Sequence, residues 1–258
     1  MADLITTECN DGIFVITMDH PKANALTLEM VRLLQGAFKE AAAQKQARVV
    51  VLRGAGEHFS AGQDVYQISK SEGESYRQHL LETYNPLIVQ IRRLDLPVLA
   101  EVNGTAAGAA LGLALACDLR IASQQARFVV GFIGIGLALD SAVSLLLPAL
   151  IGLGRATEAA FTNKPISAKE ALEWGLVNRL VPLAELHSRT LQMAKLLAAG
   201  PIHSMALAKR DFNQAILPQL EQVLDYEAHI QEIARSGVEH REGVRAFVEK
   251  RSPAWEAR

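Results

Sequence analysis

Short, almost wholly apolar runs punctuate the first half of the chain and predict buried strands. These runs cover residues 13–18, 48–53, 98–102, 119–122 and 127–130. Stretches of helical period separate several of them, at about 75–94 and 104–117 and after Thr27, a plausible N-cap. The helix after Thr27 would place four apolar residues on one face: Met30, Leu33, Leu34 and Phe38. Strands that alternate with helices in this way predict an α/β fold.

The pattern changes to mainly helical from residue 154 onward, with no repeats, low-complexity segments or flexible linkers. We therefore expect a core over residues 1–200 and a helical C-terminal region over residues 201–258. A helical extension after an α/β core suggests a lid or an oligomerisation element.

The most apolar stretch, residues 128–151, contains one ionisable group, Asp140. A transmembrane helix would need about 20 apolar residues, but Asp140, Pro148 and three glycines interrupt this stretch. Asp140 would also make a good N-cap for a helix that begins at Ser141. Alternatively, Asp140 is a catalytic base whose pKa is raised by the apolar side chains around it. Local sequence alone leaves these alternatives open.

Net charge, cysteine spacing and the first residues of the chain indicate which binding partners and which cellular compartment to expect. The 258 residues carry a formal net charge of −2, which argues against binding to nucleic acid or an anionic membrane. Cys9 and Cys117 have no metal-binding or redox spacing. The first residues lack a basic segment followed by an apolar run, so we expect a cytoplasmic protein with no membrane partner.

Two segments rich in small residues are expected to contribute to the same site. Residues 59–64 (FSAGQD) and 104–112 (GTAAGAALG) both lead from a loop into a predicted helix. The glycine spacing matches neither a dinucleotide-binding fingerprint nor a P-loop. Each segment can instead direct a backbone N–H at a ligand oxygen, and two such groups form an oxyanion hole.

These segments also carry a resemblance to the crotonase, or enoyl-CoA hydratase/isomerase, superfamily. Four motifs in the right order extend the resemblance over nearly the whole chain: FSAGQD, residues 97–118, residues 166–182 and residues 241–253. The resemblance implies an α/β fold in which ββα turns form a spiral with two roughly perpendicular sheets. It also implies an acyl-CoA thioester substrate, no separate cofactor or metal, and a homotrimer or a dimer of trimers.

Individual roles follow from the same resemblance. The oxyanion donors map onto the backbone N–H groups of Gln63 and Ala109. The substrate-binding residues that it implies, together with the apolar walls expected around Asp140, are Lys22, Ala23, Ala25, Ala61, Phe132, Leu137, Phe247 and Lys250.

The departures from the family pattern bear most on the reaction. Family hydratases use two glutamates, and this chain has Gly112 and Phe132 at those positions. Asp140 aligns instead with an Asp of certain isomerases and dehalogenases, so we expect an isomerase with one Asp acid/base. Within the family the pattern looks most like the isomerases that act on 1,2-epoxyphenylacetyl-CoA in phenylacetate breakdown. Those enzymes usually have Pro before the Asp and Gly-Gly after it, where this chain has Leu139 and Ala142-Val143.

Three alternatives stay open: hydratase-like activity, nucleophilic dehalogenation through Asp140, and a catalytically inactive subunit. Five other polar residues are expected to have structural roles or to lie at the surface: His58, Asp64, Glu101, Asn103 and Asp118.

Overall fold

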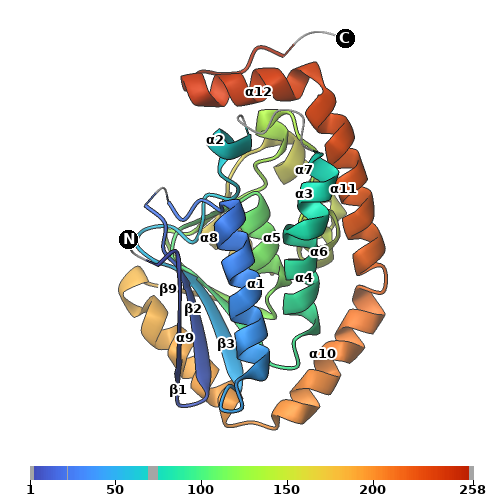
Figure 1. Cartoon of the computed structure of the whole chain (residues 1–258). Helices are drawn as coiled ribbons and strands as arrows, with labels where there is room; N and C mark the ends of the chain where they lie inside the picture. The colour runs from blue at the N-terminus through green and yellow to red at the C-terminus, as the bar shows by residue number, and fades with distance from the viewer. Residues whose placement is uncertain (1–2, 22, 69–74, 256–258) are drawn as a thin grey trace.

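A computed structural model describes residues 3–21, 23–68 and 75–255, which form two sheets surrounded by helices (Figure 1). The large sheet has the strand order β1-β2-β3-β4-β6-β9 and is parallel except for the β1–β2 hairpin. Its strands are Ile5–Asn10, Ile13–Met18, Val49–Gly54, Val98–Val102, Leu119–Ser123 and Arg179–Val181. The small sheet has the order β5-β7-β8, with strands Thr105–Ala107, Arg127–Val129 and Ile166–Ser167.

Both faces of the large sheet are buried at its central strands, which explains the continuous apolar runs of those strands. Successive side chains of a strand point to opposite faces. In β2, Ile13 and Val15 pack in a cluster with helix α9, whereas Phe14 and Ile16 pack in the main core with α1, α4 and α5.

Helices make up most of the remaining chain. They are α1 Leu28–Ala43, α2 Val65–Ile68, α3 Tyr76–Glu82, α4 Tyr84–Arg93, α5 Ala109–Ala116, α6 Val143–Ile151, α7 Leu153–Thr162, α8 Ala168–Glu173, α9 Leu183–Ala198, α10 Ile202–Ile216, α11 Leu220–Ser236 and α12 Val238–Glu249, with a 3₁₀ turn η1 at Ile133–Ile135.

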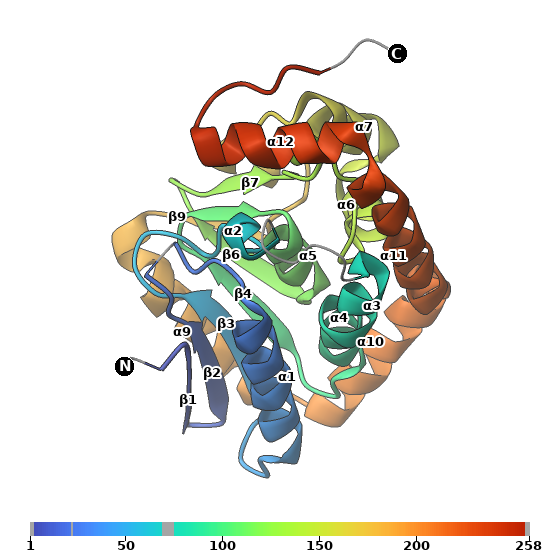
Figure 2. The same cartoon turned by 45° about the horizontal axis from the view of Figure 1, so that its top comes forward.

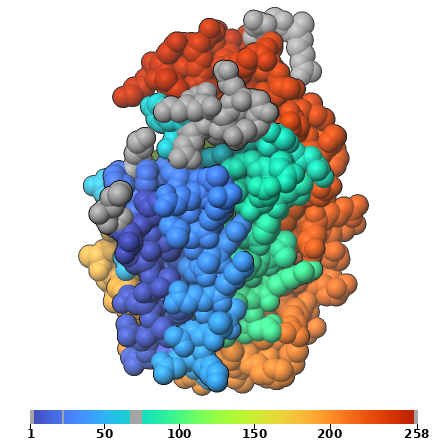
Figure 3. Space-filling model, viewed as in Figure 1, coloured from blue at the N-terminus to red at the C-terminus, as the bar shows by residue number. Residues whose placement is uncertain are grey.

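The C-terminal helices run along one edge of the molecule, and α12 lies across one end (Figures 2 and 3). Helix α11 contributes Leu224 and Ala228 to the same core as the sheet. The expected boundary at residue 200 stays a prediction.

Several local predictions need correction. Thr27 does cap α1 through the N–H of Met30, but Leu33, expected on the buried face, is 42% exposed. The helix expected at 75–94 is two helices divided at Thr83, whose Oγ1 donates to the carbonyl of His79. The segment after Gly104 forms a short strand, β5, before helix α5 begins.

The apolar stretch 128–151 is not a membrane-spanning helix. It divides into the end of strand β7, the turn η1, an irregular segment and helix α6. Among the described residues, no helix is long and apolar enough to cross a membrane.

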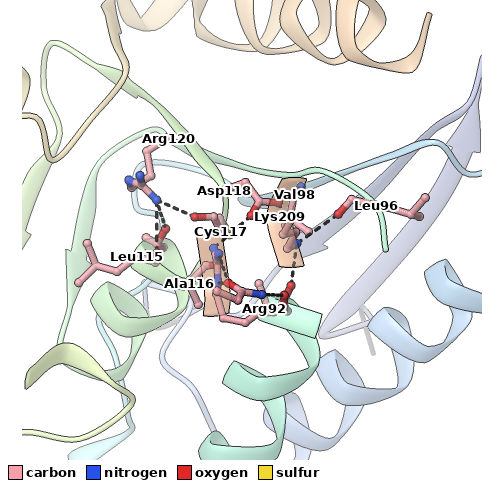
Figure 4. Close-up of polar contacts among 12 residues, drawn as sticks. Arg92, Leu96, Val98, Leu115, Ala116, Cys117, Asp118, Arg120 and Lys209 are labelled. Carbon is pink, nitrogen blue, oxygen red and sulfur yellow. Dashed lines mark hydrogen bonds and ion pairs between the residues drawn. The ribbon is translucent and has the colours of Figure 1, made fainter. Parts of the chain in front are cut away.

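Buried arginine side chains donate to the last carbonyls of helix α5 (Figure 4). Arg120 donates to the carbonyls of Ala114, Leu115 and Cys117 at the C-terminal end of α5. Asp118 follows this helix and bonds to Lys209 at 2.8 Å and Arg92 at 3.1 Å. Cations near the last carbonyls of a helix complement its dipole. The opposite end of α5 carries Ala109.

Candidate active site

The two small-residue segments lie side by side. The N–H of Ser60 donates to the carbonyl of Thr105, and the N–H of Ala107 donates to the carbonyl of Ser60. Gly62 has a φ of +83°, and a Cβ there would lie 2.5 Å from the carbonyl oxygen of Ala107. Only glycine tolerates both the left-handed backbone and this approach.

This arrangement leaves two backbone donors directed toward a common space. Ala109 is the first residue of α5, so its N–H has no partner within the helix. Leu26 bonds to the residues on either side of Gln63, so the N–H of Gln63 faces away from Leu26. Neither N–H has a hydrogen-bond acceptor within the described ranges. A Cβ on Gly62, the residue before Gln63, would lie 3.7 Å from the nitrogen of Ala109, so the two segments approach closely at this point.

A pocket of about 390 Å³ opens beside these donors. Seven of the predicted site residues line it: Ala25, Ala61, Gln63, Ala109, Phe132, Leu137 and Phe247. Phe247 reaches the pocket from α12, which packs on η1 at Gly243, and its ring lies 6.3 Å from that of Tyr66.

The other predicted binding residues lie elsewhere. Ala23 is outside the lining, although its carbonyl accepts the N–H of the lining residue Ala61. Lys250 ends α12 in a left-handed conformation and does not line the pocket. Lys22 lies outside the residues that the structure describes.

Sequence reasoning missed Tyr76, which holds the side chain of Gln63. The Tyr76 hydroxyl donates to Gln63 Oε1 at 2.7 Å, and Gln63 Nε2 lies 3.1 Å from His79 Nε2. Burial raises the pKa of Tyr76 well above its ordinary value, and the charge of nearby Asp140 raises it further. Tyr76 therefore stays protonated and acts as a donor. The signal in the sequence was only Ser75, the N-cap of α3.

Asp140 is 1% exposed and is held by two donors. Ser141 Oγ donates to one carboxylate oxygen and Gln231 Nε2 to the other, both at 2.7 Å. Burial raises the pKa of Asp140 to about 7, and the neighbouring Glu227 raises it as well, while the two hydrogen bonds oppose this rise. The carboxyl does not line the pocket, but Leu137, close to it in sequence, and Tyr76, which its charge perturbs, both do.

The prediction that Asp140 caps the next helix is wrong. Helix α6 begins at Val143, after two residues with left-handed φ, Ser141 at 56° and Ala142 at 61°. Its first N–H groups bond to a carboxylate from α11: Glu227 accepts from the N–H of Ala142 at 2.8 Å and of Ser144 at 3.0 Å. The capping group is supplied from 85 residues away, and local sequence gave no sign of it.

The two positions that carry glutamates in family hydratases hold no carboxyl group. A Cβ on Gly112 would lie 2.5 Å from both Cβ and the carbonyl oxygen of Ser141, so no side chain fits there. Phe132 presents its ring to the pocket, close to Gly108. Where family hydratases have two glutamates, this chain therefore has a closely packed glycine and an apolar side chain that lines the pocket.

Of the five remaining polar candidates, Asp64 lines the pocket and the other four lie outside its lining. Glu101 bonds to His187 and pairs with Arg53. Asn103 Nδ2 donates to the carbonyls of Gly54, at the end of β3, and Gly56, and Asp118 belongs to the buried cluster at the end of α5. Asp64 lines the pocket and accepts the N–H of Tyr66 at the start of α2. His58 is half-buried and does not line the pocket.

Comparison with known proteins agrees with this geometry. A family model described as enoyl-CoA hydratase/isomerase matches residues 8–258. The chain belongs to this family. Its α/β crotonase fold, with two sheets and C-terminal helices, is thereby confirmed, and it is an enzyme of the enoyl-CoA hydratase/isomerase family.

Relatives of this family differ in their named reactions. The chain is 38% identical to a probable enoyl-CoA hydratase of Rhodobacter capsulatus, over 98% of both chains. It is 34% identical to the 1,2-epoxyphenylacetyl-CoA isomerase of Escherichia coli, again over 98% of both. A crystal structure of an enoyl-CoA hydratase from Mycobacterium avium subsp. paratuberculosis superposes with a TM-score of 0.90 at 32% identity and covers 99% of each chain.

Proposed function

We propose that this enzyme is an acyl-CoA isomerase. The thioester carbonyl accepts the N–H groups of Gln63 and Ala109, and Asp140 moves a proton between carbons of the acyl group. The two donors favour the enolate that forms when the α-proton leaves. Loss of one such donor typically costs about 3–4 kcal/mol of transition-state stabilisation.

One observation supports isomerisation over hydration: positions 112 and 132 carry no carboxyl group, whereas Asp140 is buried near the pocket and has a raised pKa. A carboxyl with a pKa of about 7 both accepts and returns a proton at neutral pH. Activating a water would need further polar partners, whereas Phe132 and Leu137 offer apolar surface. In this proposal the acyl group reaches Asp140 between Leu137 and Tyr76.

The substrate is proposed as a CoA thioester with an unsaturated or ring-epoxide acyl group. The narrower choice, epoxide-to-oxepin rearrangement in phenylacetate breakdown, is supported by the likeness to the Escherichia coli isomerase. Homotrimeric assembly and a cytoplasmic location stay predictions.

The test measures α-proton exchange and product formation together. The protein is incubated in heavy water with enoyl-CoA and aryl-epoxide CoA esters, and products are followed by mass spectrometry. We expect deuterium incorporation at the α-carbon and an isomerised product, with no product to which water has been added. Asp140→Asn should abolish both while CoA-ester binding persists, and Asp211→Asn, at an exposed position of α10, is the matched control.

Two results would overturn the proposal. One is full isomerase turnover by Asp140→Asn with normal ester binding. The other is rapid hydration of crotonyl-CoA by the wild-type protein, because this chain has Gly112 and Phe132 where family hydratases have their two glutamates.

A further inference from the structure

Helix α11 makes an unusual set of contacts with the segment that carries Asp140. Gln231 spans this segment: its Oε1 accepts the N–H of Ala138, and its Nε2 donates to both the carbonyl of Ala138 and the carboxylate of Asp140. Gln231 is fully buried. One side chain therefore fixes both the backbone before Asp140 and the carboxylate itself.

Glu227 lies one turn earlier on the same face of α11 and holds the other side of Asp140. It is 4% exposed and accepts the N–H groups of Ala142 and Ser144, together with the hydroxyl of Ser144. Its two carboxylate oxygens thus satisfy the start of helix α6.

The segment between these contacts is strained. Ser141 has a φ of 56° and Ala142 a φ of 61°, the left-handed conformation that is unfavourable for residues with a Cβ. Such conformations persist only where the surroundings determine them. Here the hydrogen bonds that Glu227 and Gln231 make with this segment stabilise its conformation from outside.

Helix α11 also contacts α3, the helix whose residue Tyr76 lines the pocket. Glu232 accepts the N–H of Arg77 at the start of α3, and the Arg235 guanidinium lies 5.2 Å from the ring centre of Tyr76. Helix α11 runs beside α3 and α6 and links the two (Figure 1).

We propose that Gln231 and Glu227 are positioning residues, which hold the strained segment 138–144 and direct the carboxyl of Asp140 toward the substrate. The inference rests on the proposed function of Asp140 and assigns the residues that control it. The two residues act on the carboxylate in opposite senses. Gln231 donates a hydrogen bond that favours the ionised form, whereas Glu227 places a negative charge nearby that disfavours it.

Within the described residues, two hydroxyl groups also lie close enough to Asp140 for its charge to act on them. Tyr76 of α3 and Tyr84 of α4 are fully buried, and the charge of Asp140 adds to the effect of burial in raising the pKa of each. Glu227 is therefore the nearby carboxylate that a substitution can neutralise.

The experiment titrates Asp140 directly by ¹³C NMR of protein labelled at the aspartate carboxyl, with the signal assigned by its loss in Asp140→Asn. Gln231→Met should raise the titration midpoint and Glu227→Gln should lower it, each by about one pH unit. The pH dependence of kcat should move in the same direction. Gln222→Met and Glu221→Gln make the same chemical changes on the exposed face of α11 and should leave the midpoint unchanged.

Each variant tests the inference by itself. If neither variant folds, both are rebuilt with Ala142→Gly, which removes the strain of the left-handed φ at that position. A midpoint that stays within 0.2 pH units, or moves the same way in both variants, overturns the inference. If the midpoints move as expected but no ester shows α-proton exchange in the wild-type protein, the proposed function fails and the positioning role stands.

Discussion

Replacing the carboxyl group of Asp140 is expected to change how the free energy of unfolding depends on pH. In the folded protein Asp140 has a pKa of about 7, raised mainly by burial, against an ordinary value of 3.8. Between these two values the unfolded chain carries an ionised Asp140 while the folded protein keeps it protonated. The folded state then binds more protons, so its stability decreases as pH rises.

The magnitude follows from the shift. Each pKa unit corresponds to about 1.4 kcal/mol, so the full difference of 7 against 3.8 amounts to about 4 kcal/mol. This contribution is present below pH 3.8 and is lost as pH rises through 7. From pH 5 to pH 8, the wild-type protein should lose about 3 kcal/mol relative to a variant that has no titratable group at this position.

Asp140→Asn is that variant. Its amide oxygen can still accept from Ser141, but its amide nitrogen would face the donor Nε2 of Gln231, at a cost of about 1–3 kcal/mol that does not depend on pH. The quantity to compare is therefore the pH dependence of the difference, not its value at one pH.

The assay is urea unfolding of both proteins at fixed protein concentration, at half-unit steps from pH 5 to pH 8. The stability of Asp140→Asn relative to wild type should rise by about 1.4 kcal/mol per pH unit up to pH 7 and then level off. Asp211→Asn is the matched surface control. A difference that stays constant over this range would refute the reasoning, because Asp140 would then be ionised in the folded protein throughout.

Three further outcomes are expected. Gly112→Ala should destabilise the protein by about 1–3 kcal/mol in urea unfolding, because its Cβ would overlap the backbone of Ser141; unchanged stability would contradict the close packing. Asp118→Asn should cost about 3–5 kcal/mol in the same assay, since two largely buried cations lose their carboxylate, and a cost below 1 kcal/mol would mean that carbonyls alone satisfy them. Tyr76→Phe should lower kcat with little change in KM, because the side chain of Gln63 loses its donor while the pocket keeps its shape; a change in KM alone would place Tyr76 in substrate binding only.

Periodicity predicted the parts of the fold that local sequence controls. Buried strands read as continuous apolar runs because the sheet is covered on both faces, and the predicted strand at residues 13–18 is β2. Leu33 shows the limit of this reasoning: helical spacing placed it on the buried face, but the face of α1 that packs on the core does not extend to it. The short strands β5, β8 and β9 have two or three residues each, too few to produce a periodic signal.

The candidate site was predictable where backbone geometry decides it and not where distant side chains do. The glycine-rich segments identified the two N–H donors because their residues must be small. Asp140 was notable for its apolar surroundings, and its pKa is raised as expected. One of its two donors is the adjacent Ser141, but the other, Gln231, comes from α11, 91 residues later, and a single sequence carries no signal that joins such positions.

The place of α11 in the chain has a consequence for synthesis. Ribosomes make proteins from the N-terminus, and the pocket loops, Asp140 and helix α6 all emerge before residue 220. Until α11 is made, the strained turn at Ser141 and Ala142 lacks Glu227 and the carboxyl of Asp140 lacks Gln231. In the nascent chain, the segments that carry the N–H groups of Gln63 and Ala109 are therefore made before the side chains of α11 that hold Asp140, so the carboxyl of Asp140 is fixed only after residue 231 has been synthesised.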